Sequence, residues 1–200
     1  MKTEPTKIKN TIVVGLGGAG CNIVEYLQKN GVEATFIGIS NPERPNFSSD
    51  IRFIKFVPPQ MSLGEGSGKF LPVSDMNQPL ILPQNIKELV TSDNRYILLA
   101  GLGGYTGTYM VEQLSDFMKQ TKIEFAVICC LPLQFEGKQR KAVAREAQTK
   151  LELHVNVTYF DPNTLSQQYG DRSLEDFFDV CNTKVLDIFK RFAHYNLWRF

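Results

Sequence analysis

Two glycine-rich stretches in this sequence have the composition of loops that hold phosphate groups. GLGGAG spans Gly15–Gly20 after the apolar run TIVV, and GLGGYTGT spans Gly101–Thr108 after ILLA. Glycine lets the backbone turn tightly and approach a ligand, and a helix that follows presents N–H groups to an anion. One such stretch can equally serve close packing of a strand on a helix, but two of them favour an anion site.

The first stretch also suits a dinucleotide. In a dinucleotide site, an acidic residue at the end of the second strand, about 20 residues on, binds the ribose hydroxyls. Here that strand, TFIGIS, ends in Ser40 and Asn41, and the next carboxylate, Glu43, comes after Pro42. The carboxylate that a dinucleotide site needs is therefore missing at the end of this strand. A dinucleotide or adenine-nucleotide site on the first stretch alone is kept as the alternative interpretation.

The second stretch adds hydroxyl groups to the backbone amides. Thr106 and Thr108 lie among its glycines, ahead of a helical segment. Amides and two hydroxyls at a helix N-terminus suit a polyphosphate. Two such stretches facing each other would grip a chain of two or three phosphates from both sides.

Short apolar runs alternate with amphipathic helical patterns along the chain. The expected strands are Thr11–Val14, Thr35–Ile39, Ile51–Phe56, Tyr96–Ala100, Phe125–Leu131 and Val155–Phe160. The expected helices are Asn22–Asn30, Gln84–Val90, Thr108–Lys119, Lys138–Leu153 and Leu174–Phe200, the last with Ser173 as its cap. Residues 41–50 and 57–83 are expected to be loops.

This alternation predicts an α/β fold: a doubly wound, mainly parallel Rossmann-like sheet with helices on both faces, ending in a long C-terminal helix. Ligands of such sheets bind at the carboxyl ends of the strands, so both glycine stretches are expected at one edge. A length of 200 residues fits a single domain, 1–200. Residues 173–200 would form the terminal helix, whose aromatic tail either packs on the sheet or is an interaction surface. The tail aromatics are Phe189, Phe192, Tyr195, Trp198 and Phe200.

Composition argues against several classes of function. With 22 basic and 21 acidic residues, the chain has no overall field that attracts nucleic acid. No apolar run approaches the roughly 20 residues that span a bilayer, so direct membrane insertion is not expected. The four cysteines lack metal-ligand spacing, which favours reduced thiols in the cytoplasm. With two histidines, neither a metal site nor a catalytic residue is assigned.

The order of the motifs resembles that of the tubulin and FtsZ superfamily, and is closer to FtsZ than to tubulin. IVVGLGGAGCNIV is similar to the first phosphate loop of the family, and LGEGSG is similar to the loop that senses the terminal phosphate. GLGGYTGT resembles the tubulin signature, PLQFEGKQR and PNT resemble two ribose motifs, and FFDVCN resembles the guanine motif. The resemblance implies GTP or GDP, with Mg²⁺, as the cofactor.

The resemblance also implies a set of nucleotide-binding residues. It places Glu136, Arg140 and Asn163 near the ribose, Phe178 against the guanine ring and Asn182 at the guanine edge. The whole set is Gly17, Gly18, Gly20, Cys21, Asn22, Gly66, Ser67, Gly103, Gly104, Tyr105, Thr106, Gly107, Thr108, Glu136, Arg140, Asn163, Phe178 and Asn182. Apart from the family, Glu136 and Arg140 equally form a surface pair, and Phe178 equally belongs to a core.

The sequence departs from the family pattern in three places. Tyr105 and Tyr109 replace glycines of the signature loop, so we expect Tyr105 to alter or obstruct phosphate binding. SNPERPNF lacks the N-T-D-x-x-x-L pattern beyond Asn41. In the family, a loop and a second domain after the guanine helix activate hydrolysis in a neighbouring subunit, whereas this sequence ends at Phe200.

Two functions remain. The favoured one is an FtsZ-like guanine-nucleotide-binding protein reduced to the GTPase domain, with weak or no hydrolysis alone. It would act by self-association or by binding another FtsZ-like protein. The alternative is a small Rossmann-type enzyme that binds a dinucleotide or adenine nucleotide through the first glycine stretch.

Overall fold

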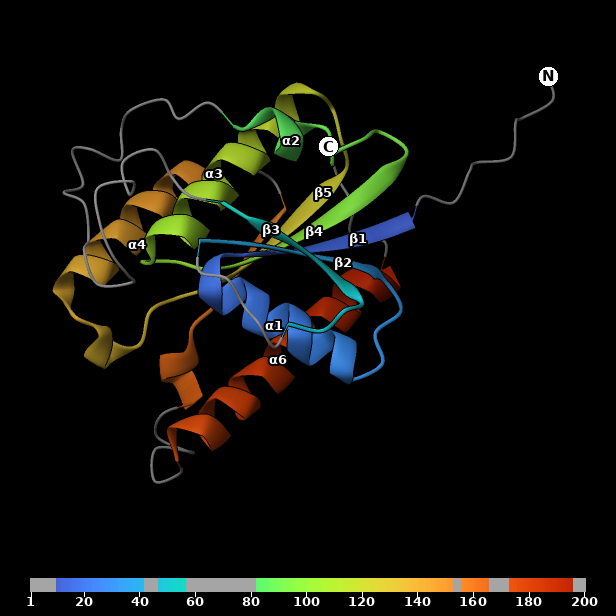
Figure 1. Cartoon of the computed structure of the whole chain (residues 1–200). Helices are drawn as coiled ribbons and strands as arrows, with labels where there is room; N and C mark the ends of the chain where they lie inside the picture. The colour runs from blue at the N-terminus through green and yellow to red at the C-terminus, as the bar shows by residue number, and fades with distance from the viewer. Residues whose placement is uncertain (1–9, 42–46, 57–81, 153–155, 166–172, 196–200) are drawn as a thin grey trace, which may run out of the picture.

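The computed structural model describes residues 10–41, 47–56, 82–152, 156–165 and 173–195 of the chain. Within these ranges, six parallel strands form one sheet in the order β3-β2-β1-β4-β5-β6 (Figure 1). Their bounds are β1 Asn10–Leu16, β2 Thr35–Ser40, β3 Ile51–Lys55, β4 Asn94–Gly101, β5 Phe125–Cys130 and β6 Val157–Phe160. The central strands are almost wholly buried, as expected of a parallel sheet covered on both faces.

Helices cover both faces of this sheet. On one face lie α1 Gly17–Lys29 and α6 Leu174–Tyr195, and on the other α2 Gln84–Lys87, α3 Tyr105–Gln120 and α4 Lys138–Leu151 (Figure 1). Two single 3₁₀ turns, η3 Gln134–Glu136 and η4 Pro162–Leu165, follow β5 and β6. The doubly wound α/β class expected from the sequence is confirmed.

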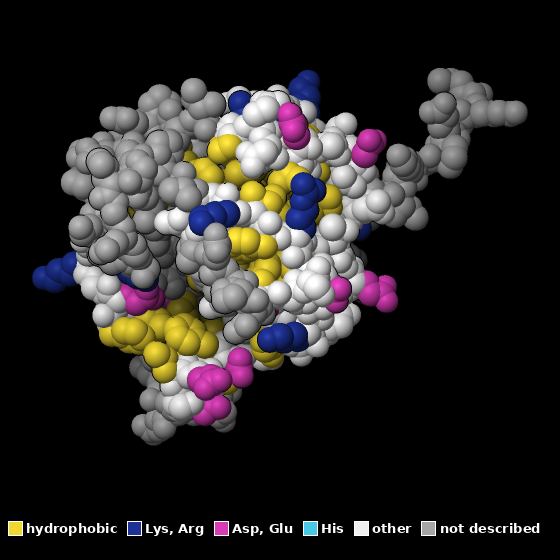
Figure 2. Space-filling view, in the orientation of Figure 1, with side chains coloured by type: hydrophobic (Ala, Val, Ile, Leu, Met, Phe, Trp, Pro, Cys, Tyr) yellow, Lys and Arg dark blue, Asp and Glu magenta, His cyan; other side chains and the backbone are white. Residues whose placement is uncertain are grey.

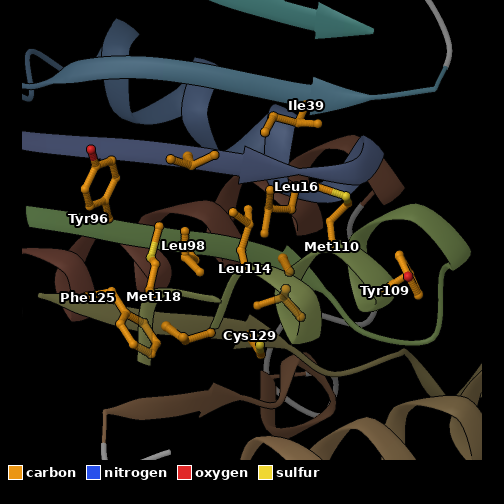
Figure 3. Close-up of a cluster of buried hydrophobic side chains, with 14 of the residues drawn as sticks. Leu16, Ile39, Tyr96, Leu98, Tyr109, Met110, Leu114, Met118, Phe125 and Cys129 are labelled. Carbon is orange, nitrogen blue, oxygen red and sulfur yellow. The ribbon is translucent and has the colours of Figure 1, made fainter. Parts of the chain in front are cut away.

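Alternating strand residues supply two separate cores. Leu98 and Cys129 pack with α3 side chains such as Met110 and Leu114 (Figure 3). Leu99, which follows Leu98 in β4, packs with α1 and α6 instead, together with the other strand side chains on that face. This period of two is what a strand buried on both faces produces, because successive side chains point to opposite faces.

The connections wind in opposite directions from the centre of the sheet. β1 pairs with β2 on one side and with β4 on the other. The chain leaves β1 through α1 on one face and leaves β4 through α3 on the other face. The carboxyl ends of β1 and β4 therefore form a topological switch point, the usual ligand position in doubly wound sheets. Both glycine stretches lie there, as the sequence predicts.

The terminal helix packs on the sheet through its apolar face. The backbone N–H of Asp176 donates to Ser173 Oγ over 3.1 Å, so Ser173 caps α6 as predicted. Phe189 and Phe192 are buried in the core shared with α1. For these two residues the packing interpretation of the aromatic tail is correct. The side chain of Tyr195, and Trp198 and Phe200, lie outside the described residues.

Every strand and helix expected from the sequence is found within the described residues, but their ends differ. β1 and β4 extend to Leu16 and Gly101, and α2 is only one turn long. Most of the expected loop 57–83 lies outside the described residues. No helix of the described ranges combines the length and the apolarity needed to cross a bilayer.

Two phenylalanines on α6 give a matched test of this packing. Phe189 is 4% exposed and Phe178 is 45% exposed. We expect Phe189→Ala to lower the free energy of unfolding by about 3–5 kcal/mol, because a cavity replaces the ring. Phe178→Ala should change it by less than about 1 kcal/mol. Urea denaturation measures both values, and equal losses would contradict the packing of α6 described above.

Candidate functional site

The starts of α1 and α3 are in direct backbone contact at the switch point. Gly17 has a φ of +70°, and a Cβ built on it would lie 2.7 Å from the backbone nitrogen of Gly107. A Cβ on Gly107 would in turn lie 2.9 Å from the carbonyl oxygen of Leu16. Since no side chain fits between them, two helix N-termini from opposite faces of the sheet meet at one place.

Other glycines bring α1 close to the sheet. A Cβ on Gly20 would lie 2.2 Å from the carbonyl oxygen of Leu99 in β4, and one on Gly15 would lie 2.5 Å from the Gly20 carbonyl oxygen. Close strand-helix packing therefore explains Gly15 and Gly20. The expectation that the glycines turn the chain ahead of the helix is wrong for Gly18 and Gly20, because α1 already begins at Gly17. It is correct for Gly103, which has a positive φ and precedes the start of α3 at Tyr105.

Gly18 and Gly104 differ from these packed glycines. No described atom lies within 4 Å of a Cβ built on either residue, and neither has a positive φ. Neither the backbone conformation nor protein packing requires glycine there. Both residues lie beside the contact of the two helix starts, and no described residue packs against their Cβ positions.

The first turns of α1 and α3 lie beside that contact. The first N–H groups of an α-helix have no partner within the helix. Neither N-cap residue, Leu16 or Gly104, makes a side-chain capping bond, and neither first turn holds an acidic residue. Exposed Ala19, which the sequence pattern did not single out, would contribute its backbone amide at the third position of α1.

The two threonines of the second stretch have different roles. Thr108 is 2% exposed, and its Oγ1 accepts a hydrogen bond of 2.9 Å from the backbone N–H of Gly103. Thr106 is only partly buried. The expectation of two hydroxyls facing a phosphate is therefore wrong for Thr108, because its hydroxyl closes the loop internally.

Tyr105 does not take a position that calls for glycine. Its φ is not positive, and its ring stacks on that of Tyr109 with centroids 6.2 Å apart and an angle of 11°. Burial raises the pKa of the Tyr105 phenol, so this group stays protonated near neutral pH. The position that does need glycine is Gly103, with a φ of +92°. The backbone conformation of Tyr105 thus gives no support to the expectation that this residue obstructs the loop.

The second stretch is fixed against α4. A Cβ on Gly103 would lie 2.7 Å from the backbone oxygen of Arg140. Farther along α3 and α4, Lys150 Nζ lies 3.3 Å from Glu112 Oε2 and 3.2 Å from Glu146 Oε1. Burial raises the pKa of Glu112, and the attraction of Lys150 opposes this shift. These contacts set the position of α3 relative to α4.

Glu136 and Arg140 form an ion pair where η3 meets α4. Glu136 Oε1 also accepts a hydrogen bond of 2.9 Å from the backbone N–H of Leu133. Both side chains remain partly exposed. The sequence expectation that the two residues lie within reach of each other is confirmed, and a ribose contact stays a prediction.

Asn163 is engaged with protein groups on both sides of its amide. Its Oδ1 accepts from the Gln134 N–H over 2.8 Å, and its Nδ2 donates to Pro132 O over 3.1 Å and to Asp161 Oδ1 over 2.7 Å. Because both amide hydrogens serve the protein, a donated bond to a sugar would have to displace one of them. Direct contact with a sugar stays a prediction.

Phe178 and Asn182 lie one turn apart on α6, outside the core. The interpretation of Phe178 as a core residue is wrong, since buried Phe177 takes that place and packs edge-on against it at 6.3 Å. Asn182 is partly buried. Figure 1 shows the beginnings of α1, α3, α4 and α6 at the same end of the molecule.

Two further residues of the first stretch have opposite exposures. The side chain of Cys21 is fully buried, and its Sγ donates to the carbonyl oxygen of Gly15 over 3.6 Å. A ligand contact through this thiol is therefore not supported. Asn22 is exposed on the turn that also carries Gly18. Gly66 and Ser67 lie outside the described residues.

The sequence and the fold both have relatives among known proteins. FtsZ of Mycoplasmopsis pulmonis is 26% identical over 198 residues, which cover 94% of this chain and 50% of that protein. The structure of an empty FtsZ dimer from M. jannaschii matches with a TM-score of 0.71 and 22% identity, covering 90% of this chain and 53% of that one. A GTPγS-bound protofilament of CetZ2 from Haloferax volcanii matches with a TM-score of 0.67 and 16% identity, covering 89% and 56%. No family model matches the chain.

The chain is thus similar in sequence to FtsZ proteins and in fold to FtsZ and CetZ. It spans about half the length of the curated relatives it matches. The part that matches carries the sheet and both glycine stretches in the order described above.

Gly20 and Gly18 allow the packed and open glycines to be compared within one helix turn. Gly20→Ala should destabilise the fold by about 1–3 kcal/mol, because the new methyl group meets the Leu99 carbonyl. Gly18→Ala should leave stability unchanged or raise it by up to about 1 kcal/mol, since alanine favours the helix and meets no described atom. Chemical denaturation of the two variants tests this difference, and a destabilised Gly18→Ala would show that the space is filled.

Proposed function

We propose that this chain binds a guanine nucleotide, GTP or GDP, at the switch point between β1 and β4. The observation that carries the proposal is the contact of two helix N-termini, with Gly18 and Gly104 beside it, where no described atom lies within 4 Å of a Cβ built on either residue. A chain of phosphates placed there would receive N–H groups from both helices, and the two positive dipole ends would favour its charge. Mg²⁺ would neutralise the remaining phosphate charge.

The nucleoside would lie toward η3 and α6. Glu136 has a partly exposed carboxylate that can accept hydrogen bonds from ribose hydroxyls. Phe178 offers a half-exposed ring for stacking, and Asn182 offers a donor and an acceptor to the edge of the base one turn later. The order of motifs shared with FtsZ supports this assignment of phosphate, sugar and base.

The use of both loops favours this function over a dinucleotide enzyme. β2 ends in Ser40, whose side chain is 1% exposed, so this position offers no carboxylate to a ribose. A site on the first stretch alone would also leave the open space beside Gly104 without a role. A nucleotide held between α1 and α3 accounts for both features.

We further propose that the 200-residue chain hydrolyses GTP weakly or not at all by itself and acts in the cytoplasm. Neither the first turn of α1 nor that of α3 holds a carboxylate that would orient a water beside the phosphates. Self-association, or binding to another FtsZ-like protein, is supported by the relatives that form a dimer and a protofilament. Phe135 is 70% exposed on η3, and Figure 2 shows hydrophobic side chains around this part of the surface.

A ligand panel tests the central assignment. GDP and GTP should raise the melting temperature of the chain, whereas ATP, NAD and FAD at equal concentration should not, because only the guanine nucleotides bind the folded state tightly. Asn182→Ala should weaken GDP binding by roughly tenfold, since base-edge groups lose their partner. Lys184→Ala, on an exposed position of the same helix, is the matched control.

The outcomes of this panel separate the two functions. Stabilisation by NAD, FAD or ATP without an effect of guanine nucleotides would establish the dinucleotide or adenine-nucleotide alternative. Equal affinity for GTP and ATP would remove the roles assigned to Phe178 and Asn182. Calorimetric titration of the parent chain and both variants gives the affinities directly.

A further inference from the structure

Residues 131–136, which lie between β5 and α4, are held in place by η4. We propose that Asp161 and Asn163 are positioning residues, which form a bracket that sets the carboxylate of Glu136 for ribose recognition without binding the sugar themselves. The inference rests on the proposed function for its ligand. The geometry of the bracket is independent of any ligand.

The side chain of Asn163 holds two peptide groups that flank one residue. Its Nδ2 donates to the carbonyl oxygen of Pro132, and its Oδ1 accepts from the N–H of Gln134. Leu133 lies between these two residues and is 4% exposed. The two hydrogen bonds of Asn163 and the buried side chain of Leu133 between them fix the path of the chain into η3.

Asp161 fixes Asn163 in turn. Asp161 Oδ1 accepts from the backbone N–H of Asn163 over 2.9 Å and from its Nδ2 over 2.7 Å. The same oxygen therefore orients both the backbone and the amide of Asn163. Bonds to an ionised acceptor are the stronger class of hydrogen bond, so the amide is locked in this orientation.

The bracket reaches Glu136 through Leu133. The backbone N–H of Leu133 donates to Glu136 Oε1, and the N–H of Glu136 donates to the Leu133 carbonyl oxygen over 3.1 Å. Glu136 then pairs with Arg140 at the start of α4. A shift of the peptide groups at 132 and 134 moves Leu133, and with it the carboxylate.

Asn163 and Glu136 have different roles in this arrangement. Asn163 has both amide hydrogens engaged by protein acceptors, whereas the carboxylate of Glu136 keeps acceptor positions beyond those used by Leu133 and Arg140. Ribose hydroxyls need an acceptor, and Glu136 provides one. Asn163 then contributes to affinity through the position of Glu136.

The first test needs no nucleotide. In the ligand-free chain, Asn163→Ala should speed hydrogen exchange of the Gln134 amide by roughly tenfold, because its acceptor is lost. Asp161→Ala should act in the same direction, while Asp161→Asn, which keeps an oxygen acceptor, should restore slow exchange. Thr164→Ala is the matched control, since the Thr164 hydroxyl bonds the Asp161 carbonyl rather than residues 131–136. Unchanged Gln134 exchange in both alanine variants would overturn the bracket.

The second test uses GDP and 2′,3′-dideoxy-GDP as probes. Asn163→Ala should weaken GDP binding by about tenfold and dideoxy-GDP binding by less than about twofold, because only GDP uses the ribose acceptor. In a chain that already carries Glu136→Gln, Asn163→Ala should weaken GDP binding little further, because the two residues act on the same contact. Equal losses for both probes, or additive losses in the double variant, would overturn the positioning role.

The two tests keep the inference apart from the proposed function. If the parent chain binds no GDP, the nucleotide assignment fails, and the positioning role fails with it, even where the exchange data support the bracket. If the parent binds GDP but Gln134 exchange is unaffected, the nucleotide assignment stands and the bracket fails.

Discussion

The contact of Gly17 with Gly107 is the constraint on which the site depends. With no side chain between these residues, α1 and α3 begin within van der Waals distance of each other although they lie on opposite faces of the sheet. A Cβ on either residue would approach the other helix start to less than 3.0 Å. The fold therefore brings the N-termini of two helices to one place at the edge of the sheet, which one loop cannot do.

The rest of the edge is arranged around this contact by hydrogen bonds and close packing. Thr108 closes the second stretch on Gly103, and Gly103 packs on the backbone of Arg140. Arg140 pairs with Glu136, whose loop is bracketed by Asn163. The phosphate side and the sugar side of the proposed site are thus joined through protein contacts, so a shift of α4 would alter both.

The sequence predicted the elements and their class because apolar periodicity is strong in a parallel sheet that is buried on both faces. The sequence could not distinguish glycines that pack against the protein from those that do not. Gly20 and Gly18 are the same residue type and differ only in whether Leu99 lies opposite. The sequence also assigned Thr108 to a ligand because of its hydroxyl, and Cys21 because of its place in the motif that resembles the first phosphate loop. Their burial follows from the turn of the helix, which the sequence pattern placed a few residues too late. Asn163 was found by its motif, but its bonds to residues 29 and 31 positions away could not be read from spacing.

Backbone amide chemical shifts during a titration with GDP test the central claim most directly. If the phosphates lie between the two helix starts, the amides of Gly18 and Ala19 in α1 and of Tyr105 and Thr106 in α3 should shift together, with one saturation curve. Shifts confined to α1, with those of Tyr105 and Thr106 unchanged at saturation, would contradict a nucleotide held from both faces of the sheet.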